Sequence, residues 1–287
     1  MYKINFEQPV HVHFIGIGGI SMSGLAEVLL EEHFTISGSD NKRSPLTEQL
    51  EKAGVTIFYG QKASNIIEGI DVVVYTAAIH EDNEEYQAAV QKGLPMLSRA
   101  ELLGQLMTNY DTPIAVSGTH GKTTTTSMLS HILLSAEMDP TISVGGILKA
   151  IGGNIRVGNS EIFLTEACEY TNSFLHFFPK IGVILNIDED HLDFFKDLAD
   201  IRHSFRKFAE LLPADGTLVI NGEIPELHEI TDGLACRVVT YGPDSSYDYS
   251  ATNILHDQIG EASFDFVKNG EFVTRIALSV NGDHNVS

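Results

Sequence analysis

The 287-residue sequence lacks the features of several protein classes. It has two cysteines, Cys168 and Cys236, too few for a disulfide framework, so a reducing cytoplasm is the expected location. No apolar run approaches the ~18 residues of a membrane span. The first ten residues, MYKINFEQPV, lack the continuous apolar segment of a signal peptide. Secreted disulfide scaffolds and membrane-spanning proteins are therefore not expected.

Basic residues are also scarce, with 18 Lys and Arg against 39 Asp and Glu and a formal net charge of −21. General binding to nucleic acid or to an anionic membrane needs a basic surface, so we expect neither kind of partner. A nucleotide ligand is still compatible, because a phosphate site is built locally from backbone N–H groups, one lysine and a metal ion. The hydrophobic fraction of 43% suits a globular protein of about two domains.

Apolar runs alternate with helical patterns over residues 1–108, which we assign to a first domain. Such alternation predicts a Rossmann-like parallel sheet with helices on both faces, an α/β fold. Strands are expected at 12–19, 34–40, 55–60, 71–79 and 95–99, and helices at 21–33, 45–54, 83–93 and 100–110.

A second α/β domain is expected over residues 109–287. It begins again as strand, loop and helix at 111–138, and it ends in two β-rich runs around Asn269-Gly270, a strong hairpin signal. The chain stops at Ser287 without a closing helix, which suggests a truncated domain. Further strands are expected at 141–146, 161–167, 181–187, 217–222 and 236–242, and a helix at 198–212.

The second domain carries a candidate phosphate loop, SGTHGKTTTT at 117–126. Its glycines lie between a buried strand and a helix, so the loop N–H groups and the helix dipole point at one spot. Lys122 would reach the β- and γ-phosphates, and the Thr123 hydroxyl would face Mg²⁺. Val116 stands where the usual G-x-x-x-x-G-K-[ST] loop has its first glycine. A plain glycine turn before a Thr-rich helix is the alternative, and the strand–turn–helix context disfavours it.

A second glycine-rich stretch, GIGGIS, spans Gly16 to Ser21. It approximates the dinucleotide fingerprint G-x-G-x-x-G, with Ser21 in place of the third glycine and suited to capping the next helix. Asp40 follows about 20 residues on, where the fingerprint expects a ribose-binding acid. A helix cap or a solvated loop acid is the alternative for Asp40. An NAD-dependent oxidoreductase is thus open, but it leaves the phosphate loop at 117–126 unexplained.

Acidic residues and a histidine follow two buried strands of the second domain. Glu166 ends a strand, where a carboxylate is costly unless it is paired or bound to a metal. Glu169 is either a further ligand or a solvated loop acid, and Cys168 is interpreted as a small filler rather than a reactive thiol. In NIDEDHLDFF, at 186–195, His191 alone would be interpreted as a loop histidine beside a carboxylate, because Mg²⁺ prefers oxygen.

The combination of five stretches resembles the Mur ligases, the ATP-dependent amide-forming enzymes of peptidoglycan precursor synthesis. The stretches are GTHGKTTTT, HFIGIGGISMSGLAEVL, TEACEYTNSFLHF, NIDEDHLDFF and the terminal GDHN. The phosphate loop of that family has the shorter form G-[TK]-x-G-K-[TS], which accounts for Val116. The family has three domains. The resemblance implies that this chain holds the UDP-sugar domain and most of the ATPase domain, and lacks the third.

The resemblance implies ATP and Mg²⁺ as cofactors, and it is greatest to members that join L-alanine to UDP-N-acetylmuramate through an acyl phosphate. The chain by itself is expected to be inactive, and its state as monomer or dimer is left open. The implied catalytic residues are Lys122, Glu166 and His191, and the implied metal ligands are Thr123, Glu166 and His191. The implied ATP-binding residues are Gly118, Thr119, His120, Gly121, Lys122, Thr123, Thr124, His284 and Asn285. The implied UDP-sugar-binding residues are Gly16, Gly18, Gly19, Ile20, Ser21, Asp40, Thr76, Ala77 and Ala78.

Other members of the same superfamily are the nearest alternatives. A ligase that recycles a tripeptide onto UDP-N-acetylmuramate, or another Mur-type amide ligase, would share these motifs. Folylpolyglutamate synthetases begin directly with the phosphate loop, so the domain over 1–108 argues against them. A non-catalytic nucleotide-binding module is disfavoured by the combination of Lys122, Thr123, Glu166 and His191.

Overall fold

The structure is a computed structural model that describes residues 2–258, 260–281 and 286. These residues divide into two compact units, which are described separately. The first unit holds the residues up to Ala115 together with Lys122–Pro179. The second holds Val116–Gly121 together with the residues from Lys180 onward. No helix within the described ranges is long and apolar enough to cross a bilayer.

The first unit begins with a five-stranded sheet in the order β3-β2-β1-β4-β5, and every strand pairing in it is parallel. The run Val72–Val74 is completely buried, as expected for an inner strand covered on both faces. The predicted Rossmann-like sheet is thereby confirmed. Its strands are β1 (His11–Ile15), β2 (Thr35–Asp40), β3 (Thr56–Tyr59), β4 (Val72–Tyr75) and β5 (Met96–Ser98).

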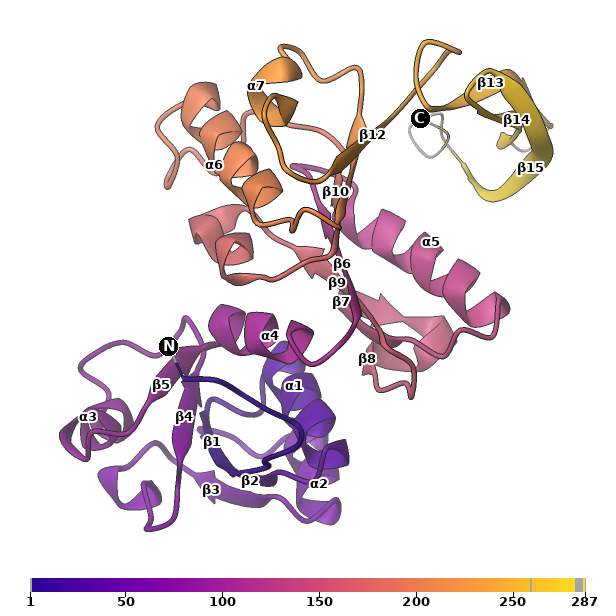
Figure 1. The fold of residues 1–287 in the computed structure, drawn as a ribbon. Helices are drawn as coiled ribbons and strands as arrows, with labels where there is room; N and C mark the ends of the chain where they lie inside the picture. The colour runs from indigo at the N-terminus through magenta and orange to yellow at the C-terminus, as the bar shows by residue number, and fades with distance from the viewer. Residues whose placement is uncertain (1, 259, 282–285, 287) are drawn as a thin grey trace. The chain divides into compact units, whose positions relative to one another are not determined.

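Local sequence fixes the helices of this sheet. α2 begins with a capping box in which the Ser44 hydroxyl accepts from the Thr47 N–H, and Pro45 occupies its first turn. Ser98 and Glu101 form the same device at the start of α4. α1 packs beside α2, and these helices contact β2 and β3, respectively (Figure 1). The helical segments are α1 (Ile20–Glu31), α2 (Pro45–Lys52), the short η1 (Ala63–Asn65), α3 (Glu84–Gln91) and α4 (Arg99–Met107).

The rest of the first unit consists of helix α5, which packs on β7 and β9, and the segments around these strands. The strands lie in the order β6-β9-β7-β8, with β7 parallel to β9 and antiparallel to β8. A seven-residue helical segment, η3, follows β9 and packs against α4. The sequence prediction missed both β8 and η3. The elements are β6 (Thr112–Ser117), α5 (Lys122–Ser135), β7 (Thr141–Leu148), η2 (Lys149–Ile151), β8 (Gly153–Arg156), β9 (Ile162–Ala167) and η3 (Tyr170–His176).

The second unit changes from parallel to antiparallel pairing along its sequence. β10, β11, β12 and β13 are parallel neighbours, whereas β13, β14 and β15 are antiparallel. The predicted hairpin is present, with Asn269 and Gly270 at positive φ between β14 and β15. The elements are β10 (Ile181–Ile184), α6 (Leu198–Glu210), β11 (Thr217–Asn221), α7 (His228–Thr231), β12 (Arg237–Gly242), β13 (Tyr249–His256), β14 (Glu261–Lys268) and β15 (Glu271–Asn281).

Replacement of Gly104 tests the packing of α4 against η3. A Cβ atom at position 104 would overlap the carbonyl oxygen of His176. Helix propensity alone predicts that Gly104→Ala stabilises by about 1 kcal/mol. The packing predicts instead a loss of about 1–3 kcal/mol in the free energy of unfolding, measured by urea denaturation.

Gly153→Ala is the matched control, because a Cβ atom there comes no closer than 3.8 Å to a neighbour. We expect this variant to unfold within about 0.5 kcal/mol of the wild type. A Gly104→Ala protein as stable as the wild type, or more stable, would refute the contact between α4 and η3.

Candidate functional site

The N-terminal glycine loop, Gly16–Gly19, joins β1 to α1 and approaches its neighbours closely. Gly16 has φ +87°, and a Cβ atom there would lie 2.8 Å from the Thr76 side chain. A Cβ atom on Gly18 would lie 2.8 Å from a carboxylate oxygen of Asp40. The structure therefore brings four of the predicted UDP-sugar residues together, and two of them have room only for glycine.

Asp40 supports this loop. Its Oδ2 accepts the Gly18 N–H at 2.9 Å, and its Oδ1 accepts the Lys42 N–H at 3.3 Å. The preceding carbonyl, of Ser39, accepts the N–H groups of both Gly16 and Ile17 at 2.9 Å. The interpretations of Asp40 as a solvated acid or a helix cap are therefore wrong, and Ser44 caps α2 instead. Contact between Asp40 and a uridine remains a prediction.

Helix α1 begins two residues earlier than the suggested Ser21 cap requires. Gly19 is its N-cap, with extended φ −68° and ψ 142°, and no side chain caps the helix. Ser21 thus lies inside the first turn, so the cap assignment is wrong, and its Oγ accepts instead from Arg99 Nη1 at 3.2 Å. The first turn holds no acidic residue. A helix start without a side-chain cap is a favourable place for an anion.

Arg99 is a residue that the sequence analysis missed. It begins α4 directly after β5, at the carboxyl end of a parallel strand where ligands bind in such sheets. Its position directly after a parallel strand is the sequence signal that could have identified Arg99. Burial lowers the pKa of Arg99, which nevertheless stays charged at neutral pH. Across the described ranges the guanidinium bonds to Ser21 and forms an ion pair with no carboxylate.

Two cavities adjoin Arg99. A cavity of about 240 Å³ brings the start of α1 and Arg99 together with a carboxylate at the end of β9. A smaller one of about 150 Å³ includes Ala77, from the turn at 76–79 after β4 that also holds Thr76 and Ala78. Burial raises the pKa of the Cys168 thiol in the larger cavity, in agreement with an unreactive filler. The larger cavity is lined among others by Ile20, Ser21, Arg99, Gly145, Glu166 and Cys168.

The second glycine loop follows β6 and leads into α5. Gly118 has φ +146°, and a Cβ atom there would lie 2.9 Å from the Leu185 Cβ. Gly121, at φ +83°, makes the turn into the helix, whose first turn contains Lys122, Thr123 and Thr124. Both glycines therefore adopt conformations that other residues rarely take. The predicted strand–turn–helix context is confirmed.

Asn186 holds the middle of this loop. Its side-chain Oδ1 accepts the His120 N–H at 2.8 Å, and its Nδ2 donates to the His120 carbonyl at 3.1 Å. The Asn186 carbonyl accepts the Thr119 N–H at 3.2 Å, and the Thr119 hydroxyl accepts the Asp188 N–H at 2.9 Å. Two predicted ATP-binding residues thus have their backbone fixed by the segment that follows β10.

Lys122 forms an ion pair with Glu169. The ammonium lies 2.9 Å from Oε2 and 3.3 Å from Oε1 of that carboxylate. The lysine side chain is 15% exposed and the glutamate side chain 2% exposed. The interpretation of Glu169 as a solvated loop acid is therefore wrong. A buried carboxylate of this kind needs the cation beside it.

Thr123 and Glu166 supply oxygen atoms next to Lys122. The Thr123 hydroxyl donates to Glu166 Oε2 at 3.0 Å, and the Gly145 N–H donates to Oε1 at 2.7 Å. A Cβ atom on residue 145 would lie 2.8 Å from Oε2, so glycine leaves room for the carboxylate. Within the described ranges no group of three or more His, Cys, Asp or Glu side chains could hold a metal ion. The oxygen pair fits Mg²⁺, which takes few protein ligands and completes its shell with phosphates and water.

His191 lies in the loop after β10 and is half-buried. It adopts φ +51°, its N–H donates to Asp190 Oδ1 at 2.7 Å, and its Nδ1 lies 3.8 Å from that oxygen. This geometry matches a loop histidine beside a carboxylate, and its role as a metal ligand remains a prediction. The predicted ATP residues His284 and Asn285 lie outside the described residues.

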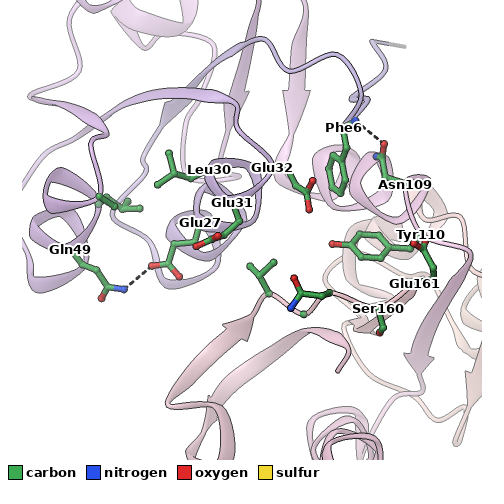
Figure 2. Close-up of a pocket in the computed structure, with 15 residues that line it drawn as sticks. Phe6, Glu27, Leu30, Glu31, Glu32, Gln49, Asn109, Tyr110, Ser160 and Glu161 are labelled. Atoms are coloured by element: carbon green, nitrogen blue, oxygen red, sulfur yellow. Dashed lines mark hydrogen bonds between the residues drawn. The ribbon is translucent and has the colours of Figure 1, made fainter. Parts of the chain in front are cut away.

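A cavity of about 720 Å³ lies elsewhere in the first unit, and none of the predicted site residues lines it. Figure 2 shows Glu27 and Glu31 of α1 and its C-cap Glu32 around it, with Tyr110 on another side. Burial raises the pKa of Glu27, and it raises that of Tyr110 to about 12. Its acidic lining disfavours phosphates, so cavity size does not identify the nucleotide site here.

Comparison with known proteins gives matches over nearly the whole chain. Residues 11–111 match the catalytic domain of the Mur ligase family, and residues 116–287 match the Mur ligase middle domain. The UDP-N-acetylmuramate–L-alanine ligase of Agathobacter rectalis is 62% identical over all 287 residues. The enzyme of that name from Caldanaerobacter subterraneus is 52% identical over 99% of the chain. This chain spans 62% of the length of each relative.

Two solved structures resemble the chain closely. The UDP-N-acetylmuramate:L-alanyl-gamma-D-glutamyl-meso-diaminopimelate ligase of Neisseria meningitides has a TM-score of 0.84 and 31% identity, covering 97% of this chain and 90% of its own. The UDP-N-acetylmuramate-alanine ligase of Thermotoga maritima has a TM-score of 0.78 and 30% identity, covering 96% of this chain and 62% of its own. The expected α/β fold of the two domains is therefore confirmed.

Removal of the Glu169 carboxylate tests the buried ion pair. Glu169→Ala leaves the Lys122 ammonium without its carboxylate, and we expect the free energy of unfolding to fall by about 2 kcal/mol in urea denaturation. Glu189→Ala, at an exposed position in the other unit, should change it by less than about 0.5 kcal/mol. Equal stabilities of the two variants would contradict the pairing.

Proposed function

Because the chain belongs to the Mur ligase family, we propose that its protein joins L-alanine to UDP-N-acetylmuramate with the hydrolysis of ATP to ADP and phosphate. The single observation that supports this best is the second glycine loop, which leads into a start of α5 where Thr123 is bonded to Glu166 and Lys122 to a second carboxylate, that of Glu169. The names of the relatives at 52–62% identity supply the substrates. We assign UDP-sugar binding to residues 1–108 and ATP binding to residues 109–287.

ATP would bind with its phosphates at the start of α5. Lys122 would contact the β- and γ-phosphates, and the N–H groups of the first helical turn would donate to phosphate oxygens. Gly118 and Gly121 allow the loop backbone to come close. Asn186 keeps this backbone in place before the nucleotide arrives, so less ordering is needed on binding.

Thr123 and Glu166 are the residues that would hold Mg²⁺, with His191 as a further proposed ligand. The ion supplies neutralisation of the negative charge that develops as the γ-phosphoryl group is transferred. The Gly145 N–H holds the Glu166 carboxylate in a fixed orientation for this task. No step requires Cys168, whose raised thiol pKa suits a passive wall.

The muramate would extend from the N-terminal glycine loop toward Glu166. Its lactyl carboxylate attacks the γ-phosphorus of ATP, so that ADP leaves and an acyl phosphate forms. The amine of L-alanine then attacks the acyl carbon, the amide bond forms, and phosphate and a proton are released. The contribution of the chain is to position the carboxylate and to stabilise charge. Arg99, in the cavity that includes Glu166, offers a positive charge to the anionic substrate.

A ligase that adds a tripeptide to UDP-N-acetylmuramate is the second candidate. The likeness to the Neisseria meningitides enzyme, at TM-score 0.84, favours it. The two reactions share every step except the identity of the attacking amine. Assay of ADP release with L-alanine or with the tripeptide separates them, and higher identity to relatives named for alanine supports the first.

Calorimetric titration with UDP-N-acetylmuramate tests the assignment of residues 1–108. We expect saturable binding of the muramate and no binding of NAD, because Ser21 stands where the dinucleotide fingerprint has its third glycine. UDP-N-acetylglucosamine, which lacks the lactyl carboxylate, should bind more weakly. Binding of NAD alone would overturn the proposed function and reinstate an oxidoreductase.

Lys122→Ala tests the ATP site. Loss of the charge-assisted contact with the phosphates should raise the Kd for MgATP at least about 30-fold, while leaving the Kd for UDP-N-acetylmuramate within about twofold. Lys207→Ala removes a charge from the exposed face of α6 and should change neither constant. Near-normal ATP affinity in Lys122→Ala would remove the basis of the phosphate assignment.

A further inference from the structure

A buried polar network lies directly behind the N-terminal glycine loop. His13 and Glu85 are completely buried, as is Ser39, and Ser37 and Asn65 are 1% and 5% exposed. None of these residues belongs to the predicted binding or catalytic sets. A carboxylate and an imidazole at such depth are costly, so the network calls for a physical account.

Glu85 is the centre of the network. Its Oε1 lies 2.7 Å from His13 Nε2 and accepts from Asn65 Nδ2 at 3.3 Å, while its Oε2 accepts the Ser39 hydroxyl at 2.6 Å. Three donors from β1, β2 and η1 therefore converge on one side chain of α3. Removal of the carboxylate would take this partner from the Ser39 hydroxyl and from His13 Nε2, whereas Asn65 Nδ2 would keep the Gly60 carbonyl, to which it donates at 2.8 Å.

The network continues to the outer part of β1. The Ser37 hydroxyl lies 2.8 Å from His13 Nδ1 and 2.8 Å from His11 Nε2. His13 and Ser37 are also register partners in the parallel pairing of β1 with β2. Ser37, His13 and Glu85 are the residue types of a hydrolytic triad, but the ring nitrogens are exchanged, since Nδ1 faces the serine and Nε2 faces the carboxylate. Burial of Ser37 at 1% exposure gives a substrate no access, so we assign it no catalysis.

Ser39 connects this network to the glycine loop. Its hydroxyl is bound to Glu85, and its carbonyl oxygen accepts the N–H groups of Gly16 and Ile17. The next residue, Asp40, accepts the Gly18 N–H. Thus the end of β2 holds three successive N–H groups of the loop, and the carboxylate of Glu85 holds the end of β2.

A polar network is an unusual way to fill this volume. Apolar side chains of similar size would stabilise the fold as well or better, because the desolvation of charged groups offsets their attraction. Hydrogen bonds are directional, however, and a fully satisfied network permits one arrangement of the groups that it joins. The benefit of the network is therefore the fixed position of the segments that it connects.

We propose that Glu85 is a positioning residue for the N-terminal glycine loop: through Ser39 and His13 it sets the backbone of Gly16–Gly19 for the diphosphate of the UDP-sugar. The identity of the ligand rests on the proposed function. The positioning does not, because every contact in it lies between residues 11 and 85. Glu85 acts through other residues and touches no substrate.

Glu85→Gln is the test, with Glu84→Gln as the matched control on the exposed face of the same helix. Gln keeps the shape but replaces one acceptor oxygen by an NH₂ group, so one of the three donors loses its partner. We expect the Kd for UDP-N-acetylmuramate to rise about 10-fold, with the Kd for MgATP unchanged. Deuterium exchange at the Gly16 and Ile17 amides should become about 10-fold faster, with no change across residues 118–121.

A purely structural role for Glu85 would increase exchange in both loops together and weaken both ligands equally, and that outcome overturns the proposal. If Glu85→Gln fails to fold, Ser39→Ala tests the proposal instead. This variant removes the hydroxyl that links Glu85 to β2, but it keeps the carbonyl that accepts the N–H groups of the loop. It should accelerate exchange at Gly16 and Ile17 selectively. A wild-type chain without affinity for UDP-N-acetylmuramate defeats the proposed function, while the exchange comparison still decides the positioning.

Discussion

Both glycine loops depend on one interaction, the hydrogen bonds that their backbone N–H groups donate to acceptors on a neighbouring segment. A tight loop cannot satisfy its own donors, and unpaired donors allow the backbone to move. In the first loop, Ser39 and Asp40 at the end of β2 accept three N–H groups. In the second, Asn186 beyond the end of β10 accepts two. The same solution thus serves two loops of unrelated sequence, and in each the supporting residues lie at the end of a parallel strand or just beyond it.

Local charge explains how a strongly acidic chain can carry a site for anions. The net charge of −21 describes the whole sequence, whereas each of the two proposed anion sites has one cation, Lys122 or Arg99, whose effect burial strengthens. Lys122 lies beside the buried carboxylate of Glu169, while Arg99 bonds to a serine hydroxyl. The two sites therefore differ in how much negative charge the protein itself contributes.

The sequence predicted most of the fold because the signals were local. Alternating apolar runs located the strands of the first sheet, and glycines at fixed distances from Lys122 located the phosphate loop. β8, at 153–156, was missed because four residues of mixed polarity carry no periodic pattern, and its place depends on pairing with β7. Ser21 was misassigned as a cap because the start of α1 depends on the extended conformation of Gly19.

The residues of the site that escaped prediction depend on contacts between distant parts of the chain. No local pattern distinguishes a buried Glu169 from a solvated one, since its burial follows from its meeting with Lys122, 47 positions earlier. The role of Arg99 likewise depends on its bond to Ser21, which lies 78 positions away in the sequence. Glu85 is the clearest case, because its sequence neighbours mark it as one acidic residue in the first turn of a surface helix.

The pairing of Lys122 with Glu169 has a consequence for any anion that reaches the second loop. The Lys122 ammonium is already paired with the Glu169 carboxylate. A phosphate that binds there therefore replaces one anionic partner of the lysine by another. The free energy gained is then the difference between the attraction of the ammonium to the phosphate and its attraction to the carboxylate, and not the full attraction to the phosphate. Dissociation of the phosphate is easier for the same reason, since the ammonium can pair again with the Glu169 carboxylate. Such an exchange favours turnover over tight retention.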